Sequence, residues 1–241
     1  MVYEEWGMEN WFDLSHTRAA QLMLQMKAPW EALLHLTDWI REEGKRLPSD
    51  RFQQIAEDVW VANSAVIAAS ASITGPAIIG ERTEIRHCAF LRGSVLVGDD
   101  AVVGNSTECK NAILFDKVQV PHYNYVGDSI LGYAAHLGAG AITSNVRADK
   151  EPVVIHFPEK SVVTGLAKPV TVRFSGKDVP TGMKKLGALV GDSAEIGCGA
   201  VLNPGVLVGP GAIVYLLSLV RGVVEPCSIY KKQGETAKRI F

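Results

Sequence analysis

Large apolar side chains recur at every sixth position over much of the chain. Four residues after most of them stands a small or β-branched residue, and glycine often follows the large one, as in Ile79-Gly80 and Val208-Gly209. A period of six fits neither the 3.6-residue turn of a helix nor the alternation of an amphipathic strand. The positions in phase are Val61, Ile67, Ile73, Ile79, Ile85, Leu91, Val97, Val103, Cys109 and Phe115, and later Val190, Ile196, Leu202, Val208, Val214 and Val220.

This period predicts a β-solenoid in which each group of six residues forms a short strand and a corner. The large residue fills the interior, the small one fits beside the corner, and glycine relieves backbone strain at the turn. After Phe115 the phase slips, and it resumes at Leu131. It disappears between Asn145 and Leu189, which predicts a protruding loop or arm, a place where function concentrates.

The same patterning divides the chain into five parts. Residues 14 to 46 carry apolar residues at helical spacings, and a helical hairpin is expected to cover the open first coil, since solenoid ends need covering. We therefore expect an N-terminal helical cap over residues 1–55, β-helix coils over 56–145, the inserted loop or arm over 146–188, the last coils over 189–225 and a basic C-terminal tail over 226–241.

The amino-acid composition excludes several classes of binding partner. The chain has 24 Lys plus Arg against 26 Asp plus Glu, a balance that argues against a nucleic-acid partner. Four cysteines stand far apart without a CxxC pair, which favours a reducing, cytoplasmic setting over a zinc cluster or a disulfide framework. The stretch 198–220 is uncharged and long enough to span a bilayer, but it contains Pro204, Pro210 and several glycines. We assign it to a soluble core and expect no membrane partner.

Polar residues interrupt the hexads between Asn105 and Asn145. The motifs are Glu108-Cys109-Lys110, then His122-Tyr123-Asn124-Tyr125-Val126-Gly127-Asp128, then Gly138-Ala139-Gly140-Ala141-Ile142-Thr143-Ser144-Asn145. With the repeat, they resemble the hexapeptide-repeat acyltransferases, in particular the acetyltransferase domain of the bifunctional enzymes that make UDP-N-acetylglucosamine. The resemblance covers roughly residues 85 to 145 and, more loosely, 188 to 232. It implies a mainly β fold, a left-handed parallel β-helix with three hexads per coil. Nothing before residue 50 resembles a nucleotidyltransferase loop, so no uridyltransferase half is expected.

The resemblance implies roles for individual residues. His122 would be the general base that deprotonates the sugar amine, work suited to an imidazole. The backbone N–H of Ala139 would face the thioester oxygen. Arg92 and Lys110 would hold the sugar phosphate, because a dianion needs paired cations. Further substrate contacts implied in this way are Glu108, Tyr125, His136, Asn145 and Lys150, and further cofactor contacts are Cys198, Lys231 and Lys232.

Three positions depart from the family pattern. His136 stands where the family has Asn, and Cys198 occupies a Ser position near the cofactor. Tyr215-Leu216-Leu217 replaces a small stretch that borders the pantetheine channel. That bulk either narrows the channel or points elsewhere.

A metal site is a further alternative, because γ-class carbonic anhydrases share the β-helix and bind zinc through three histidines. His87, His122 and His136 are separated by 35 and 14 residues. That family places two ligands five apart, a spacing absent here, so no metal is expected.

The leading hypothesis is an acetyl-CoA-dependent N-acetyltransferase acting on glucosamine-1-phosphate or a related amino-sugar phosphate. The family's shared active sites imply a homotrimer. The alternative hypothesis is a non-catalytic solenoid that binds a sugar phosphate or nucleotide sugar and partners or regulates a separate nucleotidyltransferase.

Overall fold

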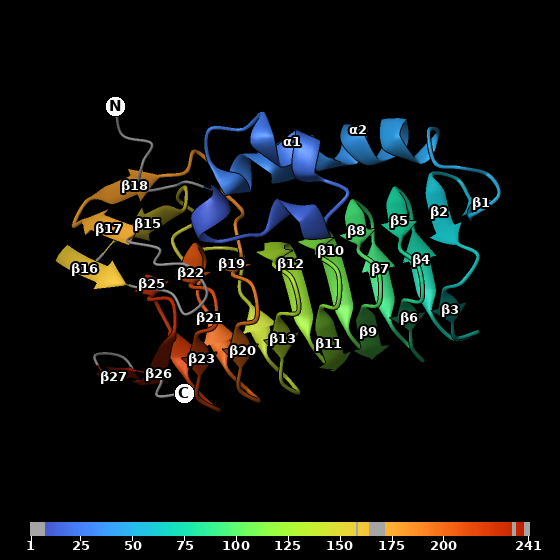
Figure 1. Cartoon of the computed structure of the whole chain (residues 1–241). Helices are drawn as coiled ribbons and strands as arrows, with labels where there is room; N and C mark the ends of the chain where they lie inside the picture. The colour runs from blue at the N-terminus through green and yellow to red at the C-terminus, as the bar shows by residue number, and fades with distance from the viewer. Residues whose placement is uncertain (1–7, 158, 164–171, 233–234, 239–241) are drawn as a thin grey trace.

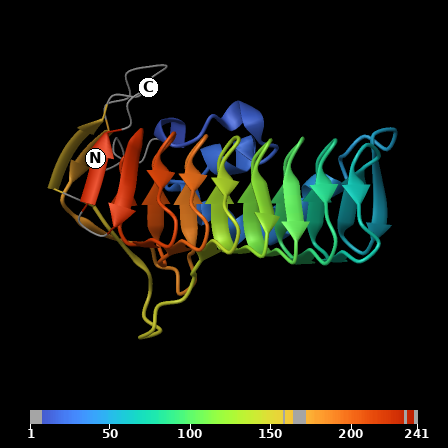
Figure 2. The same ribbon diagram turned by 90° about the horizontal axis from the view of Figure 1, so that it is seen from below.

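The chain winds into a β-solenoid whose strands stack in parallel from coil to coil (Figures 1 and 2). The computed structural model describes residues 8–157, 159–163, 172–232 and 235–238. Each coil contributes one strand to each of three faces, so the faces run the length of the molecule. The mainly β solenoid predicted from the hexads is confirmed.

The strands of the three faces are as follows. The first face contains β2 (Val59–Ala62), β5 (Ala77–Ile79), β8 (Val95–Val97), the second halves of β10 (Glu108–Leu114) and β12 (Tyr125–Leu131), β19 (Ala188–Val190), β22 (Val206–Val208) and β25 (Val223–Val224). The second face contains β4 (Ser72–Thr74), β7 (Phe90–Arg92), the first halves of β10 and β12, β14 (Ile142–Thr143), β21 (Val201–Leu202) and β24 (Leu219–Val220). The third face contains β3 (Val66–Ile67), β6 (Glu84–Ile85), β9 (Val102–Asn105), β11 (Gln119–His122), β13 (His136–Leu137), β20 (Glu195–Ile196), β23 (Ile213–Val214) and β26 (Ser228–Lys232).

The interior is a set of apolar ladders, one rung per coil. On the first face the rungs pair in the order Val61, Ile79, Val97, Leu114, Leu131, Val190, Val208 and Val224. Phe115, expected in the hexad phase, is therefore one residue out of register. It is still buried, and its ring lies 5.4 Å from that of Phe12. The coil that ends at Leu114 is one residue short, so the slip begins before Phe115 and not after it.

The N-terminal helices lie along the flank of the solenoid and not across its end. Helix α2 (Ala32–Gly44) packs over β5, β8 and β10, and α1 (Ala20–Leu24) packs against α2 (Figure 1). The hydroxyls of Thr37 and Ser94 are 2.6 Å apart. Gly44 lets the end of α2 approach the ring of Trp60, which a Cβ atom would overlap. Three short 3-10 turns, Met8–Asn10, Leu14–His16 and Pro29–Glu31, complete this layer.

Antiparallel strands instead cover the first face at its start and the third face at its finish. β1 (Phe52–Ala56) pairs antiparallel with β2 at the start, and β27 (Glu235–Lys238) pairs antiparallel with β26 at the finish. An edge strand that is paired in this way no longer offers its own free backbone groups. β26 itself pairs parallel with β23. The tail expected from residue 226 thus begins as one more solenoid strand, because Ile229 and Tyr230 continue the apolar ladder.

The insertion leaves and rejoins the solenoid at one corner. The N–H of Leu186 donates to the carbonyl of Asn145 at 3.0 Å, and the N–H of Gly187 donates to the carbonyl of Asp128 at 2.8 Å. Between these points β15 (Val154–His156) pairs antiparallel with β18 (Asp178–Pro180), and β16 (Glu159–Val163) pairs antiparallel with β17 (Val172–Ser175). No helix among the described residues is long and apolar enough to cross a membrane.

Candidate functional site

The corners at Asn111 and Asp128 are one residue shorter than the corner before them. That earlier corner places Gly93 and Ser94, both at positive φ, between β7 and β8. The next two corners have a single such residue each, Asn111 and then Asp128, with φ of 48°. Asn and Asp tolerate left-handed backbone better than other non-glycine residues. β10 and β12 consequently run unbroken across two faces. The side chains of Asn111 and Asp128 lie at the point where each strand passes from the second face to the first.

Asp128 is the centre of a polar cluster at this corner. Its carboxylate is 4% exposed. It accepts hydrogen bonds from Lys110 Nζ at 3.0 and 3.3 Å, from Asn111 Nδ2 at 2.8 Å and from Asn145 Nδ2 at 2.5 Å. Asn145 Nδ2 also lies 3.2 Å from the hydroxyl of Tyr125. Asp128, which the sequence analysis did not assign although it closes the motif that begins at His122, therefore holds Lys110 and Asn145 together, and Asn145 in turn contacts Tyr125.

The predicted phosphate-binding cations already have carboxylate partners. Arg92 Nε lies 2.8 Å from Glu108 Oε1, and Lys110 is held by Asp128. Arg92 is half-exposed, whereas Lys110 is more than two-thirds covered. A phosphate that binds here must therefore displace or share these carboxylates, and Arg92 is the easier of the two cations to release.

His122 stands at the other edge of the second face, on a corner that repeats in every coil. The strand pairing places His122 opposite Asn105, and the same register, continued past the ends of the paired strands, brings Ala139 and then Cys198 to this corner on the next two coils. The backbone joins these coils: the N–H of Gly140 donates to the carbonyl of His122 at 3.0 Å, and the N–H of Gly199 donates to that of Ala139 at 2.8 Å. Residues separated by up to 76 positions are thus brought into one row.

The groups of this row face outward. His122 and Cys198 are exposed and Ala139 is half-buried. Among the described residues, nothing accepts a hydrogen bond from the N–H of Ala139. Beneath His122, Asn124 is buried, accepts from the N–H of His122 at 3.1 Å and donates to the carbonyl of Gly138 at 2.8 Å. Asn124 therefore ties the His122 coil to the Ala139 coil. Its position, two residues after His122, matches the inward small-residue position of the repeat.

The thiols differ sharply in their environment. Cys109 points into the core below Lys110, and burial raises the pKa of its thiol to about 12. Cys198 is exposed at the His122 corner. Since the thiolate is the reactive form, Cys109 is inert and Cys198 is accessible to reagents.

Four other predicted residues lie elsewhere. His136 is on the third face, in β13, where its Nδ1 is 2.8 Å from Glu195 Oε2. Lys150 is exposed in the turn after Asn145, with its N–H bonded to the carbonyl of Arg147 at 3.1 Å. Lys231 and Lys232 are exposed at the end of β26. None of these is brought to the Asp128 cluster within one chain.

The bulky stretch Tyr215-Leu216-Leu217 points into solvent. Leu216 and Leu217 are 65% and 77% exposed, and Leu217 has a φ of 55°, which is costly for a leucine. With the neighbouring exposed apolar residues they form an apolar strip along the His122 corner and the adjacent second face. The members of this strip are Tyr123, Ile142, Tyr215, Leu216, Leu217 and Leu219.

The described residues contain no group of three His, Cys, Asp or Glu side chains that could hold a metal ion. His87 and His122 share the repeating corner but lie two coils apart, roughly 10 Å at the spacing of paired strands. His136 lies on a different face, so the three histidines do not converge.

Comparison with known proteins agrees with the repeat and the motifs. A family model described as the GMPPB C-terminal domain matches residues 73–174. The bifunctional protein GlmU of Methanococcus maripaludis is 32% identical over 145 residues, which are 60% of this chain and 31% of that protein. The bifunctional sugar-1-phosphate nucleotidylyltransferase/acetyltransferase of Sulfurisphaera tokodaii is 30% identical over 127 residues, or 53% of this chain and 27% of that protein.

The chain thus spans about a third of the length of these relatives. An uncharacterized acetyltransferase of Escherichia coli, YaiX, is 30% identical over 172 residues, which are 64% of this chain and 66% of that protein. Among solved structures, a hexapeptide transferase family protein from Anaplasma phagocytophilum covers 76% of this chain and 81% of its own, at 16% identity and a TM-score of 0.41, a likeness too distant to bear on function. The six-residue repeat, the solenoid and the sequence relatives together show that the chain belongs to the hexapeptide-repeat acyltransferase family.

Proposed function

We propose that the protein is an acetyl-CoA-dependent N-acetyltransferase whose substrate is glucosamine-1-phosphate or a related amino-sugar phosphate. The observation that carries the proposal is the row of His122, Ala139 and Cys198 on one corner, beside a face that bears Arg92 and Lys110. The name of the Sulfurisphaera tokodaii relative, a bifunctional sugar-1-phosphate nucleotidylyltransferase/acetyltransferase, supports a substrate of this class.

The proposed mechanism uses the exposed imidazole as general base. The substrate amine is protonated near neutrality and must lose a proton before its nitrogen attacks the thioester carbon. His122 would take that proton, and the unpaired N–H of Ala139 would donate to the oxyanion that forms. Collapse of the tetrahedral intermediate breaks the C–S bond and releases the thiol of coenzyme A, which takes up a proton, and the amide remains on the sugar.

Arg92 and Lys110 would hold the phosphate, which would replace part of their contacts with Glu108 and Asp128. His122 and Lys110 lie at opposite edges of the second face, since Lys110 is in register with Gly127, five residues beyond His122. Five residues span at most roughly 17 Å when fully extended, and the turn at Tyr123, where φ is 48°, makes the separation shorter than this. We propose that a homotrimer, with a site assembled from two adjacent subunits, bridges this separation.

The apolar strip supports the same assembly. Exposed contiguous apolar surface commonly marks an interface, and this strip borders the His122 corner. We propose that it packs against the next subunit, so that the bulk at Tyr215-Leu216-Leu217 meets a partner chain or the pantetheine arm. Light scattering of Leu217→Asp should then show loss of the trimer, while Val66→Asp, at a valine that is 65% exposed on the third face, should keep it.

The direct test is acetyl transfer to amino-sugar phosphates with detection of the released thiol. His122→Ala should lose at least a hundredfold in kcat, as expected for a general base. His87→Ala is the matched control, because His87 is exposed on the same corner two coils earlier, and its activity should be unchanged. Equal rates for His122→Ala and the wild type, or no turnover of any amino-sugar phosphate by the wild type, would refute the proposal.

The non-catalytic alternative rests on the paired state of the cations, which is compatible with simple capture of a sugar phosphate. Calorimetry separates the two functions. Binding of glucosamine-1-phosphate without binding of acetyl-CoA would favour a sensor, whereas binding of both favours the enzyme.

A further inference from the structure

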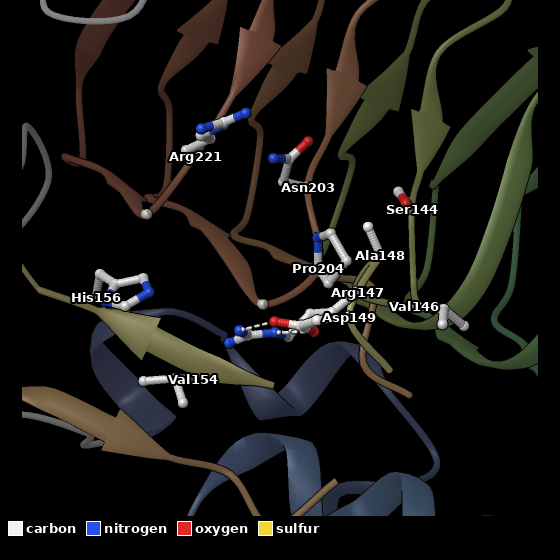
Figure 3. Close-up of a pocket in the computed structure, with 12 residues that line it drawn as sticks. Ser144, Val146, Arg147, Ala148, Asp149, Val154, His156, Asn203, Pro204 and Arg221 are labelled. Carbon is white, nitrogen blue, oxygen red and sulfur yellow. Dashed lines mark hydrogen bonds and ion pairs between the residues drawn. The ribbon is translucent and has the colours of Figure 1, made fainter. Parts of the chain in front are cut away.

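A pocket lies between the insertion and the last coils of the solenoid, away from the His122 corner. Its volume is about 580 Å³, within the range of small-molecule sites. One wall is the second face and its adjoining corner, and the other is the insertion from Val146 to His156 (Figure 3). The lining residues that carry the argument are Ser144, Arg147, Asp149, His156, Asn203 and Arg221.

The solenoid wall presents a row of donors. Thr143, Leu202 and Val220 are paired across consecutive coils, so the residues that follow them, Ser144, Asn203 and Arg221, occupy one outward column. Neighbouring coils lie ~4.8 Å apart, so the three side chains span roughly 10 Å. Among the described residues, nothing pairs with the side chain of Ser144 or of Asn203, and no carboxylate forms an ion pair with Arg221.

The facing wall is held in place by its own ion pairs. Arg147 donates from Nε and Nη2 to both carboxylate oxygens of Asp149, the former at 2.9 Å, and His156 Nδ1 lies 2.8 Å from Asp178 Oδ1. In Figure 3 the Arg147–Asp149 pair and His156 lie across the pocket from Asn203 and Arg221. The Arg147–Asp149 pair is neutral as a unit, and among the lining residues the charge of Arg221 has no carboxylate partner, so the pocket favours an anion.

The two walls fit closely, so the pocket is built and not a gap between loops. Gly205 and Gly222 stand at solenoid corners with φ of 78° and 71°. A Cβ at Gly205 would lie 2.6 Å from Val153 Cγ1, and one at Gly222 would lie 3.2 Å from the carbonyl oxygen of His156. Side chains at these corners would push the insertion away, so the glycines let the insertion strand β15 pass directly over the coils.

We propose that this pocket is a second ligand site, which takes a phosphate-bearing small molecule with its phosphate against Arg221. A guanidinium suits this task because it offers a fork of donors to phosphate oxygens. Asn203 and Ser144 supply neutral donors beside it, and the half-buried Val146, Val154 and Pro204 offer apolar surface to the rest of the ligand. Arg221 is four coils from Lys110, roughly 19 Å away, so the site is separate from the one proposed for the acetyl acceptor.

The test is calorimetric titration with inorganic pyrophosphate. The titration uses the double variant Arg92→Gln/Lys110→Met, which removes the other candidate cations. Its affinity is compared with that of the triple variant that also carries Arg221→Gln. Loss of a charge-assisted pair costs about 1.5–3 kcal/mol, so affinity should fall at least tenfold. Arg221→Lys, which keeps the charge without the fork, should give an intermediate affinity. Arg86→Gln, at an exposed arginine of an early coil, should change nothing.

Because acetyl transfer is not measured, failure of the proposed enzymatic function leaves this result unaffected. Circular dichroism of Arg221→Gln checks that it folds as the parent does. Pyrophosphate binding that vanishes in Arg92→Gln/Lys110→Met protein, or that survives Arg221→Gln unchanged, would overturn the second site.

Discussion

Removing the negative charge of Asp128 should destabilise the protein far more than removing a comparable charge at the surface. In Asp128→Asn the new amide keeps one acceptor oxygen, and its NH2 group faces Lys110 or the amides of Asn111 and Asn145. One hydrogen bond to a charged group is lost, at about 1.5–3 kcal/mol, and a donor then meets a donor. Lys110 is 27% exposed and recovers part of its hydration, so the loss stays below the 3–5 kcal/mol typical of a fully buried pair.

We therefore expect about 2–4 kcal/mol of lost unfolding free energy, measured by urea denaturation followed by circular dichroism. Asp100→Asn is the matched control, because Asp100 forms an equally direct ion pair with Arg82 but is 38% exposed, and about 1 kcal/mol or less is expected there. In a Lys110→Met background the cost of Asp128→Asn should shrink by about 1 kcal/mol, the coupling expected of contacting groups. Equal costs at the two aspartates, or no coupling to Lys110, would refute the role given to Asp128.

Three further outcomes test other parts of the structure. Gly104→Ala should destabilise the solenoid by several kcal/mol, since a Cβ would overlap the backbone carbonyl of Pro121, a position that cannot yield as a flexible side chain does; an unchanged thermal midpoint would contradict this. Burial raises the pKa of Asp192 from 3.8 to about 6, so the stability it contributes is full below pH 4 and is lost as pH rises through 6, by up to about 3 kcal/mol. That loss should disappear in Asp192→Asn when urea midpoints are compared from pH 4 to pH 7. Iodoacetamide should modify Cys198 in the native protein and spare Cys109, and acetyl-CoA should slow the modification of Cys198 if the cofactor lies along the His122 corner, as mass spectrometry of the labelled peptides would show.

The hexads alone predicted the strands of most coils, because a solenoid repeats one local solution and each large aliphatic residue meets its own equivalent in the next coil. Phe115 shows where this reasoning ends. The period placed it in the ladder, but one residue is missing from the corner at Asn111, and only strand pairing reveals that Leu114 takes the rung. Likewise, helical spacing between residues 14 and 46 predicted helices without showing that they lie along the flank.

Part of the candidate site could likewise be predicted from the sequence, and part could not. Motif likeness selected His122 and Ala139, which share one corner, and Lys110 and Asn145, which share the Asp128 cluster. Asp128 and Asn111 were missed as organisers, since a short corner is visible only in three dimensions.

Apolar periodicity along one chain is enough to specify a solenoid, because burial of a large residue once per side of each coil is a local requirement repeated many times. Tertiary structure alone decided which residues meet across it. Cys198 joins the corner of His122 and Ala139, and Arg221 faces the insertion across a pocket, because both ends of the long insertion are hydrogen-bonded at a single corner. Contacts of that kind depend on the point at which the chain rejoins the solenoid after the insertion, and the spacing of residues in the sequence does not contain that information.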